Sequence, residues 1–284
     1  MPSLIDLRRR IRSVKNTQQI TKAMKMVSAA KLRRAQDKAL AARPYAAILQ
    51  QMLSNVAEAA AKGDGGEHPL LAVRPENRVL YVVVAADGGL AGGFNSNILR
   101  LAQRAADENP ARERQFETIG KKARDYFRRR GYTIHGAHVD LYRHLKYEDA
   151  EKIAETIIEL FSKGEIDAVY VFGNEFKRVM ASKLTSMRLL PIEVPKAAPV
   201  DYLYEQPPEE LLGSLLPRYV KLQIYRALLE STAAEHAARM TAMDAATKNA
   251  SDMIDRLTLY MNRVRQASIT REIIEIVSGS AALD

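Results

Sequence analysis

The sequence predicts an α/β fold in which the two terminal segments are long helices that pair as an antiparallel α-helical coiled coil. Three features support this fold class. Residues 4–61 contain no glycine, about 60 residues from Arg218 to Ser278 contain neither glycine nor proline, and residues 77–190 alternate strand-like with helix-like segments. Helix interiors tolerate glycine and proline least, so long stretches without them predict long helices.

The first predicted element is a single helix within residues 1–61. Ser3 is placed as its N-cap, and Asp6 follows three residues later, as in a capping box. Apolar residues then recur mostly at spacings of three and four, the period of one helix face: Leu4, Leu7, Ile11, Val14, Ile20, Met24, Val27 and Ala30. The glycine-rich stretch KGDGGEHP that follows predicts the end of this helix.

The second predicted element is a Rossmann-like α/β domain over residues 70–200. The stretch RVLYVVVAA is rich in β-branched residues and is typical of a buried strand. Helix-like segments (NSNILRLAQRAADE, KARDYFRRRG and YEDAEKIAETIIELFSKG) alternate with strand-like segments (QFETIG, DAVYVFG and RVMASKLTSMRLLPI). This alternation predicts a small domain built on a largely parallel sheet.

The third predicted element, residues 201–284, joins a proline-rich connector to the second long helix. A helix from Arg218 to about Ser278 is too long to fit inside a compact domain. Its apolar residues follow a heptad pattern, with Met240, Thr247, Ile254 and Met261 at one position and Met243, Ala250, Leu257 and Val264 at the other. The expected partner is the N-terminal helix, and the pair is expected to project from the α/β domain as a rod.

Composition excludes several kinds of chemistry. The chain has no cysteine, so disulfides, zinc–thiolate sites and cysteine nucleophiles are excluded. Of its five histidines only His135 and His138 are close in sequence, and their spacing favours surface or core positions over a metal site. No apolar run approaches the ~20 residues that span a bilayer. The N-terminus lacks the apolar stretch of a secretory signal and is expected to be that of the mature protein.

The net charge of +9 is concentrated near the N-terminus. Residues 1–43 contain twelve Lys and Arg residues and two Asp residues, whereas the rest of the chain is nearly neutral. Such a segment predicts an acidic partner: an acidic protein, a nucleic acid or an anionic membrane. Its lack of aromatic residues, and the spread of Arg8, Arg9 and Arg10 around the helix, favour a protein over a nucleic acid.

The stretch VAADGGLAGGFNSN, residues 84–97, follows a predicted strand and opens a predicted helix, as phosphate-binding loops do. Its glycines do not form the dinucleotide-binding pattern, and no Gly-Lys-Ser/Thr follows. We therefore expect a tight turn with close helix–strand contact rather than a nucleotide site. We find no convincing acid–base pair, nucleophile or metal motif, and we expect no catalytic residue, cofactor or metal.

Four stretches, spread along the whole chain, resemble the same family of proteins. They are SVKNTQQITKAMKMVSAAKLRRAQ, ADGGLAGGFN, DYLYEQPPEELLGSLLPRYV and the C-terminal stretch from Ala238 to Leu283. All four are similar to the gamma subunit of F-type ATP synthases, in its bacterial form. The family often has Arg or Lys at the position of Gly88 and Cys at that of Ala91, so this chain departs from the family in the turn.

The resemblance implies a central rotor stalk rather than an enzyme. In that family the paired terminal helices enter a ring of three alpha and three beta subunits. The α/β domain and a foot sit with epsilon on the membrane-embedded c-ring. Proton-driven rotation then changes the catalytic beta subunits in sequence. One copy is expected per complex, peripheral on the cytoplasmic face of the bacterial plasma membrane. A nucleic-acid-binding coiled-coil protein or a nucleotide-binding α/β protein is the alternative.

The resemblance also implies contact residues. Arg265, Gln266, Thr270 and Glu272 match positions that hydrogen-bond to loops of the catalytic subunits. Met24 and Lys25 match the collar region beside an acidic segment of beta. Tyr202, Leu203, Tyr204 and Glu205 match the foot that touches the c-ring.

The C-terminal helix is predicted to end on an apolar face formed by Ile269, Ile273, Ile274, Ile276 and Val277, which we call the apolar tip. At 100° per residue these side chains span an arc of roughly 160°, wider than one partner helix covers. The sequence therefore predicts that apolar surfaces of other chains cover part of the apolar tip.

Overall fold

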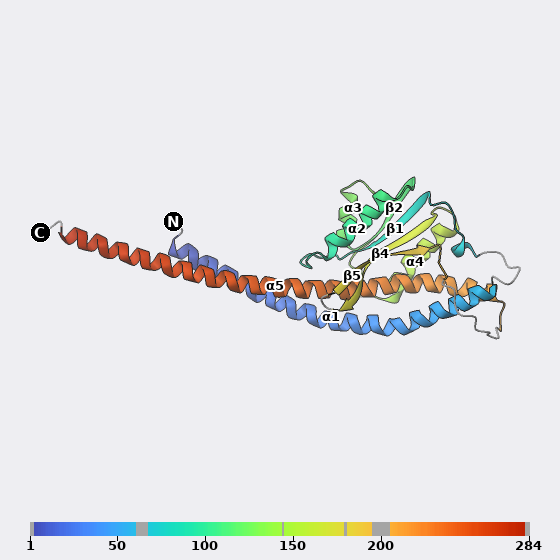
Figure 1. The fold of residues 1–284 in the computed structure, drawn as a ribbon, viewed down its shortest axis with the longest axis horizontal. Coiled ribbons are helices and arrows are strands. Elements are labelled where there is room, and N and C mark those ends of the chain that lie inside the picture. The colour runs from blue at the N-terminus through green and yellow to red at the C-terminus, as the bar shows by residue number, and fades with distance from the viewer. Residues whose placement is uncertain (1–2, 61–67, 144, 179–180, 195–204, 282–284) are drawn as a thin grey trace. The chain divides into compact units, whose positions relative to one another are not determined.

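The computed structural model describes the whole chain except residues 1–2, 61–67, 144, 179–180, 195–204 and 282–284. The chain divides into two compact units. The two-helix unit combines residues 1–28 with 240–284, and the α/β unit spans residues 29–239. Two long helices, α1 (Leu4–Ala60) and α5 (Pro208–Ala281), contribute to both units (Figure 1).

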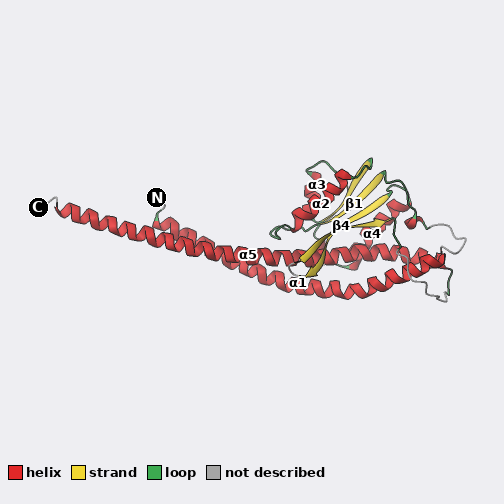
Figure 2. Cartoon of the chain, viewed as in Figure 1, coloured by secondary structure: helices red, strands yellow, loops and turns green. Residues whose placement is uncertain are grey.

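The α/β unit is built on a sheet of five strands in the order β3-β2-β1-β4-β5 (Figure 2). The strands are β1 (Arg78–Val84), β2 (Glu113–Ile119), β3 (Thr133–His138), β4 (Ala168–Arg178) and β5 (Ala181–Leu190). The first four run parallel, and β5 pairs antiparallel with β4 at one edge. The prediction of a largely parallel sheet is confirmed.

Helices cover both faces of this sheet, so both faces are apolar. Along β1, Val79, Tyr81 and Val83 point into one core with α2 (Phe94–Glu108) and α3 (Lys121–Arg128). Leu80 and Val82 point into the other core, which contains residues from α4 (Tyr147–Ser162), α1 and α5. Two short 3-10 helices, at Pro69–Leu71 and Leu141–Arg143, complete the described elements of this unit.

Helix α5 begins ten residues before the predicted start at Arg218. That prediction is wrong because it treated Pro217 as a helix breaker. Pro208 occupies the first turn, where a missing N–H costs nothing, and Pro217 leaves only the carbonyl of Gly213 without its helical donor. The buried side chains of Leu212 and Leu216 anchor these first turns to the core of the α/β unit.

In the two-helix unit, α1 and α5 run antiparallel. The hydroxyls of Thr21 and Thr247 lie 2.8 Å apart, and the Lys25 ammonium lies 2.6 Å from the Asp244 carboxylate. Met243 and Ala250 are buried in the seam, as the heptad pattern predicts. The predicted capping box is also present, since the Asp6 N–H donates to Ser3 Oγ and the Ser3 N–H donates to the Asp6 carboxylate.

Candidate interaction surfaces

The seam of the two-helix unit is closed by polar contacts as much as by apolar ones. The Thr21 and Thr247 hydroxyls share one hydrogen bond, so one of them donates to the other, and the second donates to its own backbone acceptor, the Gln18 oxygen for Thr21 or the Met243 oxygen for Thr247. Asp244 accepts from Lys25 and pairs with Lys248 one turn later, and these two hydrogen bonds lower the pKa of its carboxyl. Paired hydroxyls and exposed ion pairs hold two helices in register with little tight interdigitation.

The residues expected to contact the ring lie on the surface of the two-helix unit. Arg265, Gln266, Thr270 and Glu272 are exposed, and Ser268 Oγ donates to Glu272 at 3.3 Å. Met24 is half-buried, and Lys25 keeps 44% of its side chain exposed although it pairs with Asp244. Of the foot residues expected to touch the c-ring, Tyr202, Leu203 and Tyr204 lie outside the described residues, and Glu205 is exposed.

The register of the two helices explains why the apolar tip is bare. The two contacts place Thr21 opposite Thr247 and Lys25 opposite Asp244, so facing residues have numbers that add to about 268. Leu4, where α1 begins, therefore falls opposite about residue 264 of α5. The apolar tip begins beyond that point, where no other helix in the described part of the chain lies beside α5 (Figure 1).

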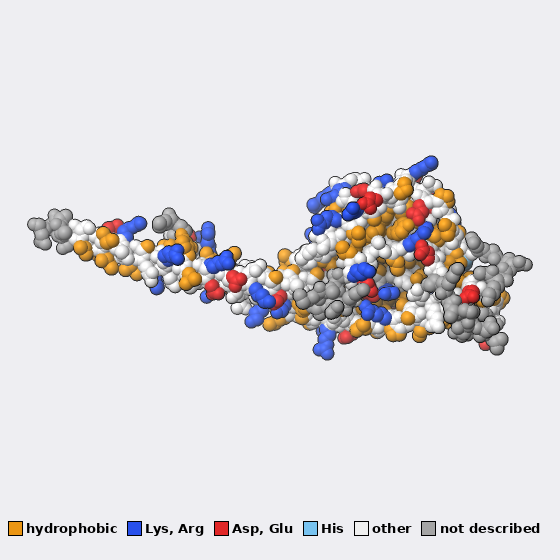
Figure 3. Space-filling model, viewed as in Figure 1, with side chains coloured by type: hydrophobic (Ala, Val, Ile, Leu, Met, Phe, Trp, Pro, Cys, Tyr) orange, Lys and Arg blue, Asp and Glu red, His pale blue; other side chains and the backbone are white. Residues whose placement is uncertain are grey.

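The five side chains of the apolar tip are all exposed, from 48% for Ile269 to 71% for Ile276. Figure 3 shows hydrophobic side chains on the surface of the last described turns of α5. Contiguous exposed aliphatic side chains mark a surface that other molecules cover. No other described residue of this chain buries them.

The glycine-rich turn after β1 serves local packing. The Asn95 side chain accepts from the Ala86 N–H at 2.9 Å and donates to the Gly88 carbonyl at 3.0 Å, tying the turn to the start of α2. Leu90 and Gly92 have positive φ, as a tight turn requires. A side chain at Gly88 would meet the Arg239 guanidinium at 3.3 Å, so glycine here leaves room for that group.

The paired histidines bind a carboxylate. Glu117 on β2 is buried, and each of its oxygens contacts a histidine of β3, His135 at 3.0 Å and His138 on the other oxygen. Within the described residues, no group of three or more His, Asp or Glu side chains is arranged to hold a metal. Likewise, none of the helices described here is both long and apolar enough to cross a bilayer.

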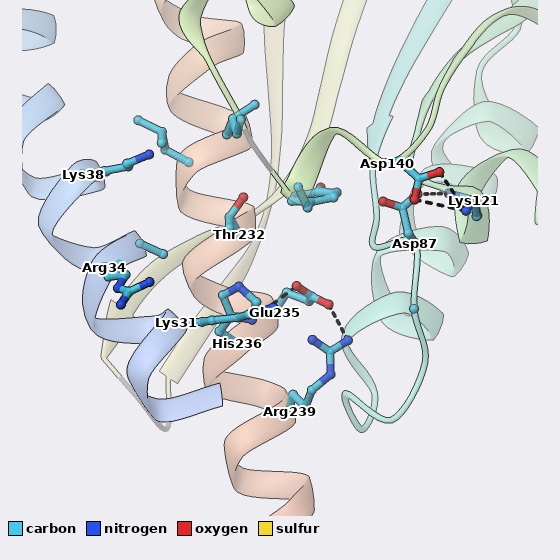
Figure 4. A pocket seen from close by; sticks show the side chains of 15 residues that line it. Lys31, Arg34, Lys38, Asp87, Lys121, Asp140, Thr232, Glu235, His236 and Arg239 are labelled. Carbon is cyan, nitrogen blue, oxygen red and sulfur yellow. Dashed lines mark hydrogen bonds and ion pairs between the residues drawn. The ribbon is translucent and has the colours of Figure 1, made fainter. Parts of the chain in front are cut away.

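Sequence reasoning missed a cleft of about 590 Å³ in the α/β unit, between α1, α5 and the loops that follow β1 and β3. We call it the basic cleft, because five cations and three carboxylates line it (Figure 4): Lys31, Arg34, Lys38, Lys121, Arg239, Asp87, Asp140 and Glu235. The spacing of Lys31, Arg34 and Lys38 on one helix face was the available signal. The charge spread around α1 as a whole obscured it.

Two adjacent residues of α5 show the electrostatics of this cleft. Burial raises the pKa of Glu235 above its usual value, although the paired guanidinium of Arg239 opposes the shift. Burial lowers the pKa of His236 to about 4, and the positive charges of Arg239 and Lys31 act in the same direction. His236 is therefore neutral at physiological pH in a positive field.

Taken together, a bare apolar helix end and a polar two-helix seam define a class of protein. It is a stalk-like subunit that acts through contact with other chains. Comparison with known proteins agrees. A sequence model described as ATP synthase matches residues 3–283.

The ATP synthase gamma chain of Solibacter usitatus is 60% identical over 286 residues, and that of Pelotomaculum thermopropionicum is 54% identical over 288, each alignment covering all of both chains. The chain belongs to the ATP synthase gamma chain family, and its function is that of the central-stalk subunit of the membrane-associated ATP synthase. This confirms the family that the terminal motifs predicted.

Solved structures show the same fold. One is a chain from the central stalk and c-ring of the Tetrahymena thermophila mitochondrial ATP synthase. It aligns with a TM-score of 0.63 at 26% identity, covering 80% of this chain and 99% of that one. A chain from the Euglena gracilis mitochondrial enzyme aligns with a TM-score of 0.69 at 19% identity, covering 99% and 94% respectively. The long C-terminal helix and its pairing with α1 are thus the expected coiled coil.

Proposed function

We propose that this chain is the rotor shaft that couples proton-driven rotation of a c-ring to sequential changes in three catalytic beta subunits. The observation that carries the proposal is the apolar tip, which extends past the start of α1 and is covered by no other described residue of the chain. In the proposed complex the paired helices enter a ring of three alpha and three beta subunits. Apolar side chains that line the inside of that ring surround the apolar tip.

The mechanism follows from symmetry. A single asymmetric helix pair inside a threefold ring presents a different face to each catalytic subunit. A partner shifts a conformational equilibrium only through unequal contacts with its states. The unequal faces of the shaft therefore hold the three beta sites in different conformations, and rotation exchanges them.

Particular side chains make these contacts in the proposal. Arg265, Gln266, Thr270 and Glu272 are exposed and able to hydrogen-bond to loops of the ring. Met24 and Lys25 lie at its collar, where Lys25 remains exposed enough to reach a second carboxylate besides Asp244. Exposed charge pairs of this kind are weakened by salt and interdigitate little, which suits surfaces that slide.

The remaining parts connect the shaft to the membrane. Residues 1–61 and the helical part of residues 201–284 form the shaft, and residues 70–200 form the globular domain. The foot, including Tyr202 to Glu205, touches the c-ring together with epsilon. A single copy then sits peripherally on the cytoplasmic face of the bacterial plasma membrane. The chain contributes no catalytic group and no cofactor site, so we expect no saturable binding of labelled nucleotide to the isolated chain.

Affinity purification of the tagged chain from its native cell tests the proposal. We expect alpha, beta and epsilon subunits to co-purify with it, both from untreated lysate and after a nuclease wash. Recovery of nucleic acid without these subunits would contradict the proposal and favour a basic coiled-coil protein that binds nucleic acid.

A further inference from the structure

The charges of the basic cleft are separated in space. Figure 4 shows Lys31, Arg34 and Lys38 projecting from α1 toward Thr232 and His236 on α5, with Asp87, Asp140 and Lys121 grouped on the other side. The carboxylates there are already engaged. Asp140 pairs with Lys121 at 2.8 Å, and Asp87 accepts from the Lys121 backbone N–H at 2.9 Å. The side of the cleft that faces α1 is therefore the positive side.

The three α1 cations have no partner in the described part of the chain. Neither a hydrogen bond nor an ion pair joins Lys31, Arg34 or Lys38 to another described side chain. Glu235 is the α5 carboxylate that lines the cleft, and it is paired with Arg239. All three side chains are exposed, so solvent screens their mutual repulsion, and an anion held between them would remove what repulsion remains.

Two buried polar atoms of the same cleft also lack partners. His236 is 8% exposed, and its Nδ1 lies 3.6 Å from the Glu235 carboxylate without a hydrogen bond to any described residue. The buried hydroxyl of Tyr142 also makes no hydrogen bond to a described residue. Both side chains line the cleft. Buried polar groups in native proteins are almost always hydrogen-bonded to protein or water, so both atoms are available to hydrogen-bond a group that enters the cleft.

We propose that the positive side of the basic cleft binds a small tetrahedral oxyanion, inorganic phosphate being the representative ligand. Arg34 supplies a planar fork for two oxygens, and Lys31 and Lys38 supply point charges on either side. Tyr142 donates its hydroxyl, and the neutral imidazole of His236 donates its ring N–H when the proton is on the nitrogen that faces the cleft. The cleft is larger than one oxyanion, so water bridges the remaining distance.

A free oxyanion fits this site better than a nucleotide. Among the described residues of the lining, the aromatic rings are those of Tyr142 and His236, and both are packed into the buried side of the cleft. The lining thus offers no exposed ring on which a base could stack. The bound anion would link α1 to α5 and stabilise the α/β unit by mass action. This inference does not depend on the rotor role and can fail separately from it.

Calorimetric titration of the full-length chain with inorganic phosphate tests the proposal, with chloride at matched ionic strength as the blank. We expect saturable binding of one phosphate per chain in the millimolar range. The double variant Arg34→Gln/Lys38→Gln removes two of the contacts and should weaken binding about 10-fold or more. Arg33→Gln is the matched control, because Arg33 is an exposed arginine of the same helix that does not line the cleft.

Thermal unfolding gives a second readout that also reports whether the variants fold. Phosphate should raise the midpoint of the wild-type chain and of Arg33→Gln, and leave that of the double variant unchanged. No saturable binding up to about 20 mM phosphate, or equal binding by the double variant and the control, would overturn the proposal. ATP binding tighter than phosphate at the same residues would overturn the assignment of a free oxyanion.

Discussion

The α/β unit and the two-helix unit bury their side chains in opposite ways. In the α/β unit, β1 is packed on both faces, and Tyr81, Phe116 and Phe127 form a stacked aromatic group with Phe116 and Phe127 centroids 4.0 Å apart. In the two-helix unit the buried positions include Thr21, Ser28, Met243 and Ala250. Of the chain's aromatic residues, only Tyr260 lies in the two-helix unit.

This difference shows where each unit obtains its stability. A core of interlocking large side chains fixes one structure and is sensitive to the loss of any of them. A seam of small, flexible and hydroxyl-bearing side chains specifies its partner weakly, and the helix that forms it ends on aliphatic residues left bare. The two-helix unit is thus suited to an environment supplied by other chains, whereas the α/β unit buries a large apolar core of its own.

The largest expected effect is in the α/β unit. Phe116→Ala should lower the free energy of unfolding by about 3–5 kcal/mol, because Phe116 is fully buried between Tyr81 and Phe127. Urea unfolding followed by near-ultraviolet circular dichroism is the measurement, since almost all aromatic residues lie in this unit. Leu257→Ala, in the half-buried seam, should cost clearly less. Equal losses of unfolding free energy in the two variants would contradict the proposed difference between the α/β unit and the two-helix unit.

A pH dependence should follow from His236. Its pKa is lowered to about 4 in the folded chain, below the value of 6.5 in the unfolded chain. Between these values the unfolded state binds a proton that the folded state does not, so stability falls as pH falls from 7 toward 4. The free energy of unfolding of the wild type should fall as the pH is lowered from 7 to 5. In His236→Gln we expect this fall to be smaller by about 2 kcal/mol.

Urea midpoints at the two pH values, in phosphate-free buffer, are the measurement for both chains. Glu235, whose pKa is raised, contributes with the opposite sign and reduces the observed loss in both chains. A variant that loses as much stability as the wild type on acidification would refute this role.

A smaller effect is expected for the seam hydroxyls. Thr21→Val removes one of the two paired hydroxyls, and the other keeps the Met243 carbonyl as an acceptor, so the cost should be about 0.5–1 kcal/mol. The double variant Thr21→Val/Thr247→Val should cost less than twice this amount, because both polar groups are then replaced together. Far-ultraviolet circular dichroism during thermal unfolding measures both. Strictly additive losses would show that the two hydroxyls act independently.

The smallest effect is expected for Asp244→Asn. This change leaves the exposed ammonium groups of Lys25 and Lys248 without their carboxylate. We expect a slight fall in the melting temperature at low salt that disappears at high salt, since exposed ion pairs are screened. A large, salt-independent fall would mean that the seam depends on this pair far more than its exposure suggests.

Much of the fold could be predicted from the sequence because local signals agreed. The run of β-branched residues in β1, the capping box at Ser3 and the heptads of α5 each specify one element. The start of α5 was missed because burial of Leu212 and Leu216 outweighs the local preference of Pro217. The basic cleft was missed because it joins residues about 200 positions apart, such as Arg34 and His236, whose proximity no local pattern encodes.

The interaction surfaces divide in the same way. The excess apolar arc of the tip could be predicted from helix period alone. That α1 ends before reaching the tip depends on the register set by Thr21–Thr247 and Lys25–Asp244, which required the structure.

The central claim is that other chains cover the apolar tip and that this contact couples rotation to catalysis. Truncation after Ser268 removes the whole tip and leaves the described seam contacts in place. The most direct measurement is proton-driven ATP synthesis by the assembled complex in membrane vesicles, with wild-type and truncated chains incorporated to equal extent. We predict that the truncated complex assembles and that its synthesis rate falls clearly below that of the wild type. An unchanged rate would contradict a coupling role for the tip.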